Sequence, residues 1–428
     1  MNRGKIFLYC DRVIIIFLCF VIFCLPFSKA GIESFIWPVI FIFILKRFLG
    51  YKGQAAWGLL PKTGLNTALG ILVIFTILSV VFSTNFGLSL RGFFGKELKF
   101  LALYFIIVEV INNSRRLKVM LGAIIISALF IIIDAGVMYF KGVDFLRGHE
   151  TGVYPFCASF FTSTGFAAWL IVIIPIFIGI IAAKIIPELR FKILLLAAII
   201  VQSLYLIKTC SRGGWFGFLV GILLIAYYVF KNSSLLVKKI CVITAVSLLC
   251  ISLLLPQSVV TNVKSYIGFN LNLSQVINER LKSMPQTNKD SATSARILLW
   301  RESLKIIRDY PLIGCGLNTY SIVAKKYKSF DEGGIYPHNS YLQKAAETGL
   351  CGLLAFLLVL CSFFRMGMRY LNQKKDYLAL GFLSGILAFL VHAFFDTHLY
   401  SLQLVVLFWY MLGLTVAIIQ LRPSAESC

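Results

Sequence analysis

The sequence predicts an all-α polytopic membrane protein, and two observations carry this prediction. Hydrophobic residues make up 59% of the 428 residues, and the mean hydropathy is +0.88. The apolar residues are also gathered into about twelve stretches long enough to cross a bilayer as helices. A soluble domain is excluded, because a water-exposed surface cannot accommodate so many apolar side chains.

The predicted spans follow one another with short polar connections, except before the tenth. Basic residues precede the first span and no small-residue cleavage site follows it, so we interpret it as a membrane anchor. The boundaries rest on hydropathy alone. The predicted spans are residues 13–27, 32–45, 67–82, 98–111, 119–140, 165–183, 191–207, 215–230, 240–255, 341–364, 377–395 and 401–421.

Lysines and arginines are distributed unequally between the two sides of this predicted bundle. With a cytoplasmic N-terminus, most basic residues of the short loops fall on the cytoplasmic side, as the positive-inside rule requires. Both termini are then predicted to be cytoplasmic. This topology accounts for most of the net charge of +23, so no nucleic-acid partner is needed to explain it.

A long polar segment separates the ninth and tenth spans and lies on the outer side in this topology. We therefore expect three parts: residues 1–255 with spans one to nine, a loop domain at residues 256–337, and residues 338–428 with the last three spans and a short cytoplasmic tail. A connection of this length is usually functional or disordered, and its composition argues against disorder.

Helical patterns recur inside the outer segment. Residues 294–309 are predicted to form a helix that Pro311 ends, and residues 318–328 a second, shorter one after a turn at Gly314 and Gly316. We interpret the segment as a helical cap lying on the membrane surface. The predicted apolar stripe of the first helix consists of Ile297, Trp300, Leu304 and Ile307.

His338 lies where this polar segment meets the tenth span. Pro337 disfavours helix before it, and Asn339 or Ser340 can cap the helix that follows. The helix dipole opposes a positive charge at this position, so a neutral imidazole able to accept a proton is expected. His338 is therefore a candidate general base. The alternative is a polar residue that merely marks the membrane boundary.

Arg212 is the clearest candidate for binding an anion. Its guanidinium is suited to a phosphate or diphosphate, Gly213 and Gly214 would let a bulky ligand approach the backbone, and Lys208 lies one turn earlier. The alternative is an arginine that snorkels to the lipid headgroups. Arg91 and Arg147 carry weaker versions of the same signal, for which snorkelling is the favoured interpretation.

Asp396, His398 and His392 form a polar cluster near the last two spans. His and carboxylate together can bind a metal, but one loop does not supply ligands at a recognisable spacing, so no metal site is assigned. The sequence also contains no Walker loop, dinucleotide fingerprint or serine nucleophile elbow. No cofactor is expected, and the energy for any reaction must come with the substrate.

Four motifs together resemble the O-antigen ligase family. The arrangement of spans and outer segment is similar over essentially the whole chain, whereas the motifs lie between residues 211 and 349. O-antigen polymerases and protein O-oligosaccharyltransferases look similar over the same stretch. The motifs are Ser211-Arg212-Gly213-Gly214-Trp215, Ala295-Arg296 with Trp300 four residues on, Tyr310-Pro311-Leu312-Ile313-Gly314-Cys315-Gly316-Leu317-Asn318, and Pro337-His338-Asn339-Ser340-Tyr341-Leu342.

This resemblance implies a glycosyltransferase of the bacterial inner membrane with its active site on the periplasmic side. The donor would be a polysaccharide on undecaprenyl diphosphate and the acceptor a sugar hydroxyl of lipid A core, with inversion and without a metal or nucleotide. It also implies that Arg212 and Arg296 bind the diphosphate and that His338 acts on the acceptor hydroxyl. The other substrate-binding candidates are Lys208, Gly213, Gly214, Trp300, Asn339, Tyr336, Arg91 and Arg147.

Two rival functions remain. A polymerase would use the same donor with a second lipid-linked chain as acceptor, and no residue distinguishes the two acceptors. A transporter of lipid-linked sugars would show inverted repeats and helices broken at mid-membrane. No convincing inverted repeat is present in the sequence, and the polar residues gather at the outer side. The transporter is therefore the weaker alternative.

Overall fold

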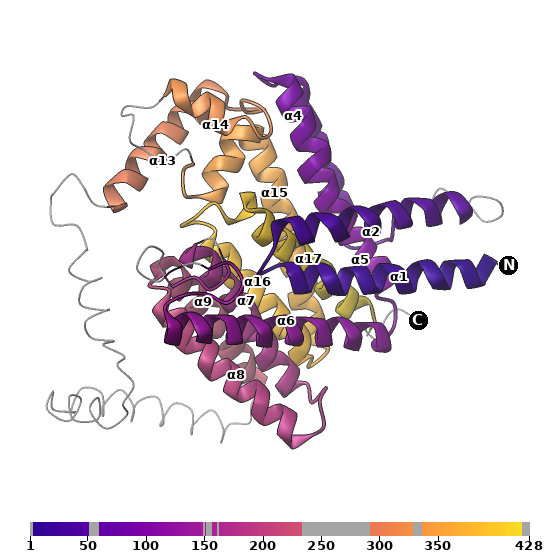
Figure 1. Ribbon diagram of the computed structural model, residues 1–428. Helices are drawn as coiled ribbons and strands as arrows, with labels where there is room; N and C mark the ends of the chain where they lie inside the picture. Colours follow the sequence, from indigo (N-terminus) through magenta and orange to yellow (C-terminus); the bar gives the residue numbers. More distant parts are fainter. Residues whose placement is uncertain are drawn as a thin grey trace, which may run out of the picture. The chain divides into compact units, whose positions relative to one another are not determined.

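The computed structural model describes residues 3–50, 60–148, 150, 156–160, 162–232, 292–327 and 336–421. Within these residues the regular structure is helical, apart from an isolated bridge between Val143 and Glu150 (Figure 1). The longer helices are α1 (Arg3–Cys24), α2 (Lys29–Gly50), α3 (Asn66–Val81), α5 (Lys99–Val110), α6 (Ser114–Lys141), α7 (Ser163–Ala182), α8 (Leu189–Lys208), α9 (Arg212–Asn232), α13 (Ala292–Asp309), α15 (Ser340–Gln373), α16 (Tyr377–His392) and α17 (Leu402–Leu421).

Every predicted span except the ninth coincides with one of these helices, and the ninth, at residues 240–255, lies outside the described residues. The fourth span begins earlier than predicted, because α4 (Phe86–Gly92) and a π-helical segment, η1 (Phe93–Leu98), lead directly into α5. Among the described helices, seven are long and apolar enough to cross a membrane, and α3 and α16 are shorter apolar helices. The all-α polytopic membrane fold is confirmed, while the count of twelve remains a prediction.

The chain divides into two compact units, Met1–Gly221 with Ala295–Cys428, and Ile222–Ser294. The second unit is described only at its two ends, in the last part of α9 and the first residues of α13. The proposed boundaries at residues 255 and 337 therefore remain predictions. The contacts described below lie within the first unit.

Helices α7 and α17 are almost completely enclosed by other helices of the first unit. Helix α16 lies close against α7 because glycine removes the side chains between them. A Cβ at Gly381 would lie 2.5 Å from the Pro175 carbonyl oxygen, and one at Gly385 would lie 2.7 Å from that of Val172. This four-residue spacing is the small-residue pattern with which membrane helices pack closely.

Helix α9 packs on the other side of α16 in the same way. A Cβ at Gly217 would lie 2.5 Å from the Ala388 carbonyl oxygen, and one at Gly221 would lie 2.9 Å from that of Ser384. Gly213 is one step earlier in this series. The glycines of α9 therefore form a ridge that fixes the first turns of α9 against α16.

A network of ion pairs connects α1, α2, α5 and α6 at the ends predicted to be cytoplasmic. The Lys46 ammonium lies 2.7 Å from Asp11 and 3.0 Å from Glu109, and the Arg116 guanidinium lies 3.0 Å from the second oxygen of Asp11. Arg47 also pairs with Glu109. These partly buried charges are thereby satisfied, and several helices are held together at one end.

Helix α15 contains a break at Gly349, whose φ of 70° and ψ of 178° are not helical. The preceding outer segment satisfies the backbone groups released there. Cys315 N–H donates to the Ala346 carbonyl oxygen at 2.9 Å, and Leu350 N–H donates to that of Pro311 at 2.8 Å. The turn predicted at residues 314–316 is confirmed, with positive φ at both glycines. It fastens the outer segment to the first part of α15.

The predicted helix at residues 294–309 is confirmed as α13, and the face that it buries in the protein is not its apolar stripe. Ile297 and Leu304 are exposed, and Trp300 and Ile307 are half-buried. The Ser303 hydroxyl, 2.7 Å from the Tyr320 hydroxyl, helps to orient the opposite face inward. The second predicted helix is shorter than expected, with only α14 (Tyr320–Val323) and a 3-10 turn, η2 (Ala324–Lys326). The buried residues of α13 are Leu299, Glu302, Ser303 and Ile306.

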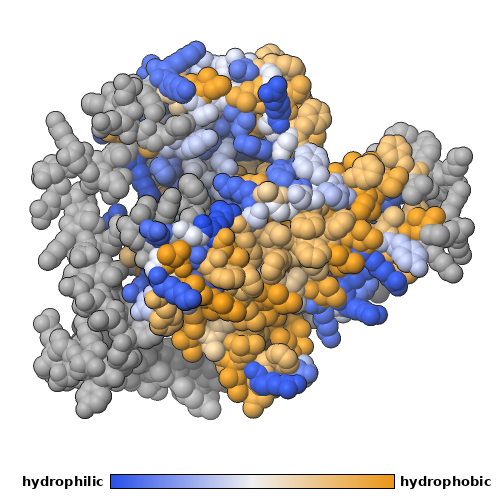
Figure 2. Space-filling model, viewed as in Figure 1, coloured by the Kyte–Doolittle hydropathy of each residue, from blue (hydrophilic) through white to orange (hydrophobic). Residues whose placement is uncertain are grey.

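The surface divides into a hydrophobic region and a hydrophilic region, as expected of a membrane protein. Figure 2 shows hydrophobic side chains gathered over α6 and the neighbouring part of α1, whereas hydrophilic side chains gather around α13 and α14. Exposed leucine, isoleucine and phenylalanine side chains are frequent on the helices that form the predicted spans. Such a continuous apolar surface is typical of lipid contact.

Candidate functional site

His338 lies directly before the cap of α15, as the sequence predicts. Asn339 is the N-cap, and its side-chain oxygen accepts from the N–H groups of Tyr341 and Leu342 at 2.9 and 3.0 Å. Ser340 N–H donates to the Ala393 carbonyl oxygen at 2.9 Å and so ties the helix start to the end of α16. Asn339 is a substrate-binding candidate whose side-chain oxygen the structure uses to start the helix.

The backbone of His338 is in the left-handed region, with a φ of 48°. This conformation costs about 1–2 kcal/mol for a residue with a Cβ, and such strain is often found at functional sites. Trp300 of α13 supports it, because its indole N–H donates to the Pro337 carbonyl oxygen at 2.8 Å. The Trp300 ring also meets Phe394 edge to face, with centroids 5.6 Å apart. Trp300 therefore fixes the loop that presents His338.

The His338 ring has a carboxylate partner that sequence reasoning missed. Its Nδ1 atom lies 3.0 Å from Oδ1 of Asp396, and the His338 side chain is 40% exposed. An ionised carboxylate only accepts hydrogen bonds, so Nδ1 must carry the proton. The other nitrogen, Nε2, then has a free lone pair and can accept a proton. This is the arrangement in which a carboxylate orients a histidine base.

The surroundings of Asp396 keep its carboxyl group ionised. Burial opposes ionisation, but the hydrogen bonds with His338 and Thr164 and the charge of His398 together hold its pKa well below the usual range. Thr397 N–H donates to the same carboxylate at 2.8 Å. Asp396 therefore remains an acceptor for the Nδ1 proton of His338 at neutral pH.

Two further histidines extend this cluster toward α9. The rings of His392 and His398 lie with centroids 4.2 Å apart, and His392 Nε2 lies 3.2 Å from the Ser211 hydroxyl oxygen. That oxygen also accepts from Gly214 N–H at 3.2 Å. The segment that carries Arg212 is thus fastened to the end of α16. The sequence indicates the cluster of Asp396, His392 and His398, but the contact between His392 and Ser211 becomes visible only in the fold.

Arg212 is the first residue of α9, and its side chain is exposed. The two glycines that follow it serve helix packing. A Cβ at Gly213 would lie 2.8 Å from Cβ of Phe395, and one at Gly214 would lie 3.0 Å from Cβ of Ala167. The structure therefore shows a packing role for both glycines, and substrate binding by them stays a prediction. It leaves the Arg212 guanidinium accessible.

Arg296 belongs to the electrostatic surroundings of the same histidines. Burial lowers the pKa of His398 to about 4, Asp396 opposes this shift, and the positive charges of Arg296 and His338 add to it. Arg296 is half-buried on α13, one turn before Trp300. The sequence-predicted residues His338, Arg296 and Trp300 are therefore brought to one region, and the Ser211–His392 contact connects the Arg212 segment to it.

The remaining candidates have other neighbours. The Arg147 guanidinium Nε donates to the Phe27 carbonyl oxygen at 2.8 Å, and the Lys208 ammonium lies over the Tyr139 ring, 5.3 Å from its centroid. Tyr336 stacks on Tyr320, with centroids 6.4 Å apart. Arg91 is exposed in the last turn of α4. These contacts assign local structural roles, and substrate binding by the same residues remains a prediction.

No group of three or more His, Cys, Asp or Glu side chains is placed to hold a metal ion within the part of the chain that the structure describes. The Asp396 carboxylate is instead engaged by His338, Thr397 and Thr164. Metal-independent action remains a prediction, which chelation can test.

The family model described as O-antigen ligase matches residues 195–357. This segment is similar to the O-antigen ligase family. It contains Arg212, Arg296 and His338, so the resemblance predicted from the motifs is confirmed, whereas Asp396, His392 and Ala393 lie beyond the matched residues. The chain is a multi-pass membrane protein with a segment that matches the O-antigen ligase family.

Two curated relatives are similar over parts of the chain. An uncharacterized protein of Haemophilus influenzae is 26% identical over 197 residues, which cover 44% of this chain and 46% of that protein. The exopolysaccharide production protein ExoQ of Rhizobium meliloti is 31% identical over 97 residues, which cover 21% of this chain and 22% of that protein. The chain thus spans less than half the length of these relatives. The family and ExoQ both concern surface polysaccharides.

Proposed function

We propose that this chain is an O-antigen ligase, a glycosyltransferase that transfers polysaccharide from undecaprenyl diphosphate to a sugar hydroxyl of lipid A core. The single observation that carries the proposal is the His338–Asp396 pair, 3.0 Å apart, in which the His338 side chain is 40% exposed and lies in the segment that matches the family model. It supplies an oriented base with a free ring nitrogen. A transferase that must deprotonate an acceptor hydroxyl requires such a group.

The reaction is a single displacement with inversion. Nε2 of His338 removes the proton from the acceptor hydroxyl while the oxygen forms a bond to the anomeric carbon of the donor. The bond between that carbon and the diphosphate oxygen breaks, and its electron pair leaves with the diphosphate. Asp396 stabilises the imidazolium that forms, because its carboxylate already accepts the Nδ1 proton.

Arg212 and Arg296 are proposed to bind the leaving diphosphate. Its negative charge increases as the bond breaks, and guanidinium groups offset such charge through paired N–H donors. Two arginines can take the place of a divalent cation here. Arg212 stands at the N-terminus of α9, where the helix dipole also favours an anion. The Ser211–His392 contact supports this position by fastening α9 to α16.

The membrane setting follows from the distribution of charge. We assign the Asp11, Lys46, Glu109 and Arg116 network of α1, α2, α5 and α6 to the cytoplasmic side, because basic residues gather there. We assign the His338 region, at the starts of α15 and α17, to the other side. We therefore place the active site on the periplasmic side of the inner membrane, with both termini in the cytoplasm. The lipid chains of donor and acceptor would reach the site from the bilayer.

A polymerase is the second candidate, and the ExoQ match favours it. That relative is named as an exopolysaccharide production protein, and the matched 97 residues are 31% identical. A polymerase would use the same base and the same diphosphate contacts, but a second lipid-linked glycan would supply the hydroxyl. The acceptor, not the chemistry, separates the two candidates.

The test uses purified protein in detergent with an undecaprenyl-diphosphate-linked glycan. One reaction contains lipid A core and the other contains donor alone, each with wild type and with His338→Ala. Glycan joined to lipid A core by wild type and not by the variant is expected. Longer lipid-linked glycan in the donor-only reaction would instead favour the polymerase. Transfer by the variant at the wild-type rate, or no transfer by either protein, would contradict the proposal.

A further inference from the structure

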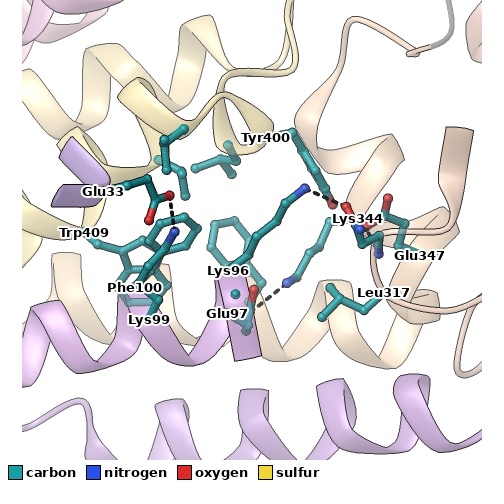
Figure 3. A pocket seen from close by; sticks show the side chains of 16 residues that line it. Glu33, Lys96, Glu97, Lys99, Phe100, Leu317, Lys344, Glu347, Tyr400 and Trp409 are labelled. Atoms are coloured by element: carbon teal, nitrogen blue, oxygen red, sulfur yellow. Dashed lines mark hydrogen bonds and ion pairs between the residues drawn. The ribbon is translucent and has the colours of Figure 1, made fainter. Parts of the chain in front are cut away.

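A cavity of about 270 Å³ lies beside the candidate site and contains none of the residues assigned to the transfer reaction. The first turns of α15, the start of α17, the π-helical segment η1 and the turn at residues 317–318 surround it. Its volume is just below the roughly 300–1,000 Å³ typical of small-molecule pockets. Figure 3 shows Trp409 and Phe100 together on one side of it, and Tyr400 and Glu347 on the other.

Charges of both signs line this cavity in equal number. The Lys99 ammonium pairs with Glu33 at 2.5 Å, and the Lys344 ammonium pairs with Glu97 at 3.0 Å. The third cation, Lys96, donates to the Asn318 side-chain oxygen at 2.6 Å, and the third carboxylate is that of Glu347. Balanced charges argue against a phosphate or other strong anion as the occupant. Buried ammonium and carboxylate groups argue equally against a lipid tail.

The Tyr400 hydroxyl is buried at the cavity wall and lies within hydrogen-bonding reach of Glu347. A tyrosine hydroxyl can both donate and accept, so a contact with one carboxyl group leaves its oxygen able to accept from a ligand hydroxyl. The Glu347 carboxylate accepts from Asn318 N–H at 2.9 Å and from the Gln343 amide at 3.3 Å, and it still borders the cavity. Hydrogen-bond donors and acceptors therefore face the same cavity.

We propose that this cavity is a sugar-binding subsite that takes one or two residues of a neutral glycan. Hydroxyl groups of a sugar ring can donate to the carboxylates and to the Tyr400 oxygen and accept from the ammonium groups, while its C–H face packs on Phe100, Phe356 or Trp409. This inference rests on the proposed function, because it assigns a place to a glycan substrate. It adds a site for holding glycan away from the reacting bond.

The position of the cavity suits that role. The Ser340 hydroxyl donates to the Asp396 carbonyl oxygen at 2.9 Å and accepts from Leu399 N–H at 3.3 Å. Leu399 and Tyr400 line the cavity, while Asp396 contacts His338. The segment that holds the base on one side therefore forms a wall of the cavity on the other. A glycan bound there would lie next to the transfer site without covering it.

Gly95 provides a sharp test because a Cβ can be added there without a steric clash. Gly95 lines the cavity, and a Cβ built on it meets no heavy atom within 4 Å. Gly95→Leu should fill part of the cavity, and a helical leucine is favoured over glycine, so the fold should be retained. Gly70 on α3 has equally open surroundings away from the cavity. Gly70→Leu is the matched control.

Binding is measured by ligand-observed NMR or calorimetry with the full-length protein in detergent. The probes are the core oligosaccharide released from lipopolysaccharide by mild acid and the repeat-unit oligosaccharide released from the lipid-linked donor. Neither probe carries a lipid or diphosphate. Binding to wild type and Gly70→Leu, at least tenfold weaker in Gly95→Leu, is expected for one probe. The probe that binds identifies acceptor or donor glycan as the occupant.

Tyr400→Phe provides a second, milder variant, since it removes a single hydroxyl from the cavity wall. Binding should weaken about three- to tenfold while thermal stability is retained. Tyr205→Phe, which loses a hydroxyl bonded to the Ile132 carbonyl oxygen outside the cavity, should leave binding unchanged. Failure of both probes to bind wild type, or unchanged binding in Gly95→Leu and Tyr400→Phe, would overturn the inference. Binding without glycan transfer would overturn the proposed reaction alone.

Discussion

Asp396→Asn removes one charge and almost no volume from the partner of the candidate base. The carboxylate holds the His338 Nδ1 proton across 3.0 Å, and such charge-assisted hydrogen bonds contribute about 1.5–3 kcal/mol. An asparagine amide can also donate to Nδ1, which would move the ring proton to Nε2 and remove the lone pair that the reaction needs. Loss of this energy in the transition state corresponds to a decrease in kcat of about 10- to 150-fold.

The assay measures kcat and KM separately, with lipid-linked donor and the acceptor that supports transfer. We expect kcat to fall and KM to stay near the wild-type value, because Asp396 acts through His338 and not on the substrate. Asp376→Asn is the matched control. Asp376 is also buried and caps α16 by accepting from Leu378 and Ala379 N–H, a role that asparagine performs as well. A kcat for Asp396→Asn within twofold of wild type would refute the tautomer argument.

Three further predictions concern the diphosphate contacts, metals and pH. Arg212→Lys should lower kcat/KM at least tenfold, because a point charge cannot reproduce a guanidinium fork; wild-type kinetics would instead favour headgroup contact. EDTA should leave transfer unchanged, and an inhibition reversed by added divalent ions would make the Asp396 cluster a metal site. Burial, with Arg296 and His338, lowers the pKa of His398 from 6.5 to about 4 against the effect of Asp396. The unfolded chain therefore binds this proton first, and stability should fall by about 3 kcal/mol as the pH drops from about 6.5 to about 4. The thermal midpoint in detergent should follow that fall in wild type and less so in His398→Phe; equal slopes would contradict the buried neutral ring.

The helices were predictable because hydropathy is a property of each stretch by itself. Apolar residues between polar loops located the helices from α1 to α17 among the described residues, and the cap at Asn339 followed from local backbone chemistry. The position of His338 outside the helix start has the same local origin. These features depend on neighbours within a few positions, so a single sequence contains the information they need.

The buried face of α13 was not predictable from its apolar pattern. Ile297 and Leu304 made a regular stripe, yet the structure buries Ser303 and Glu302 on the other side. The reason lies in a partner distant in the fold, since the Ser303 hydroxyl meets Tyr320 and Ile306 packs with Cys315 and Ala346. An amphipathic rule assumes that apolar side chains face protein. At a membrane surface they can equally face lipid.

The partner of His338 was hidden for a related reason. Asp396 is 58 residues away in the sequence, and nothing in its own surroundings distinguishes an orienting carboxylate from a metal ligand. Only the packing of α15 against the end of α16, through Ser340 and Ala393, brings the two together. Sequence reasoning found the polar cluster and the base separately. Their relation required the fold.

The motifs between residues 296 and 349 are better understood as one structural unit that holds the His338 loop than as separate binding elements. The turn at Gly314 and Gly316 makes no contact with His338, but it fastens the outer segment to α15 at the break around Gly349. Trp300 fastens the same segment to Pro337, directly before the base. His338, held in the left-handed region, therefore sits between two attachment points. A strained residue persists only where its surroundings over-determine it, and these two attachments provide that constraint.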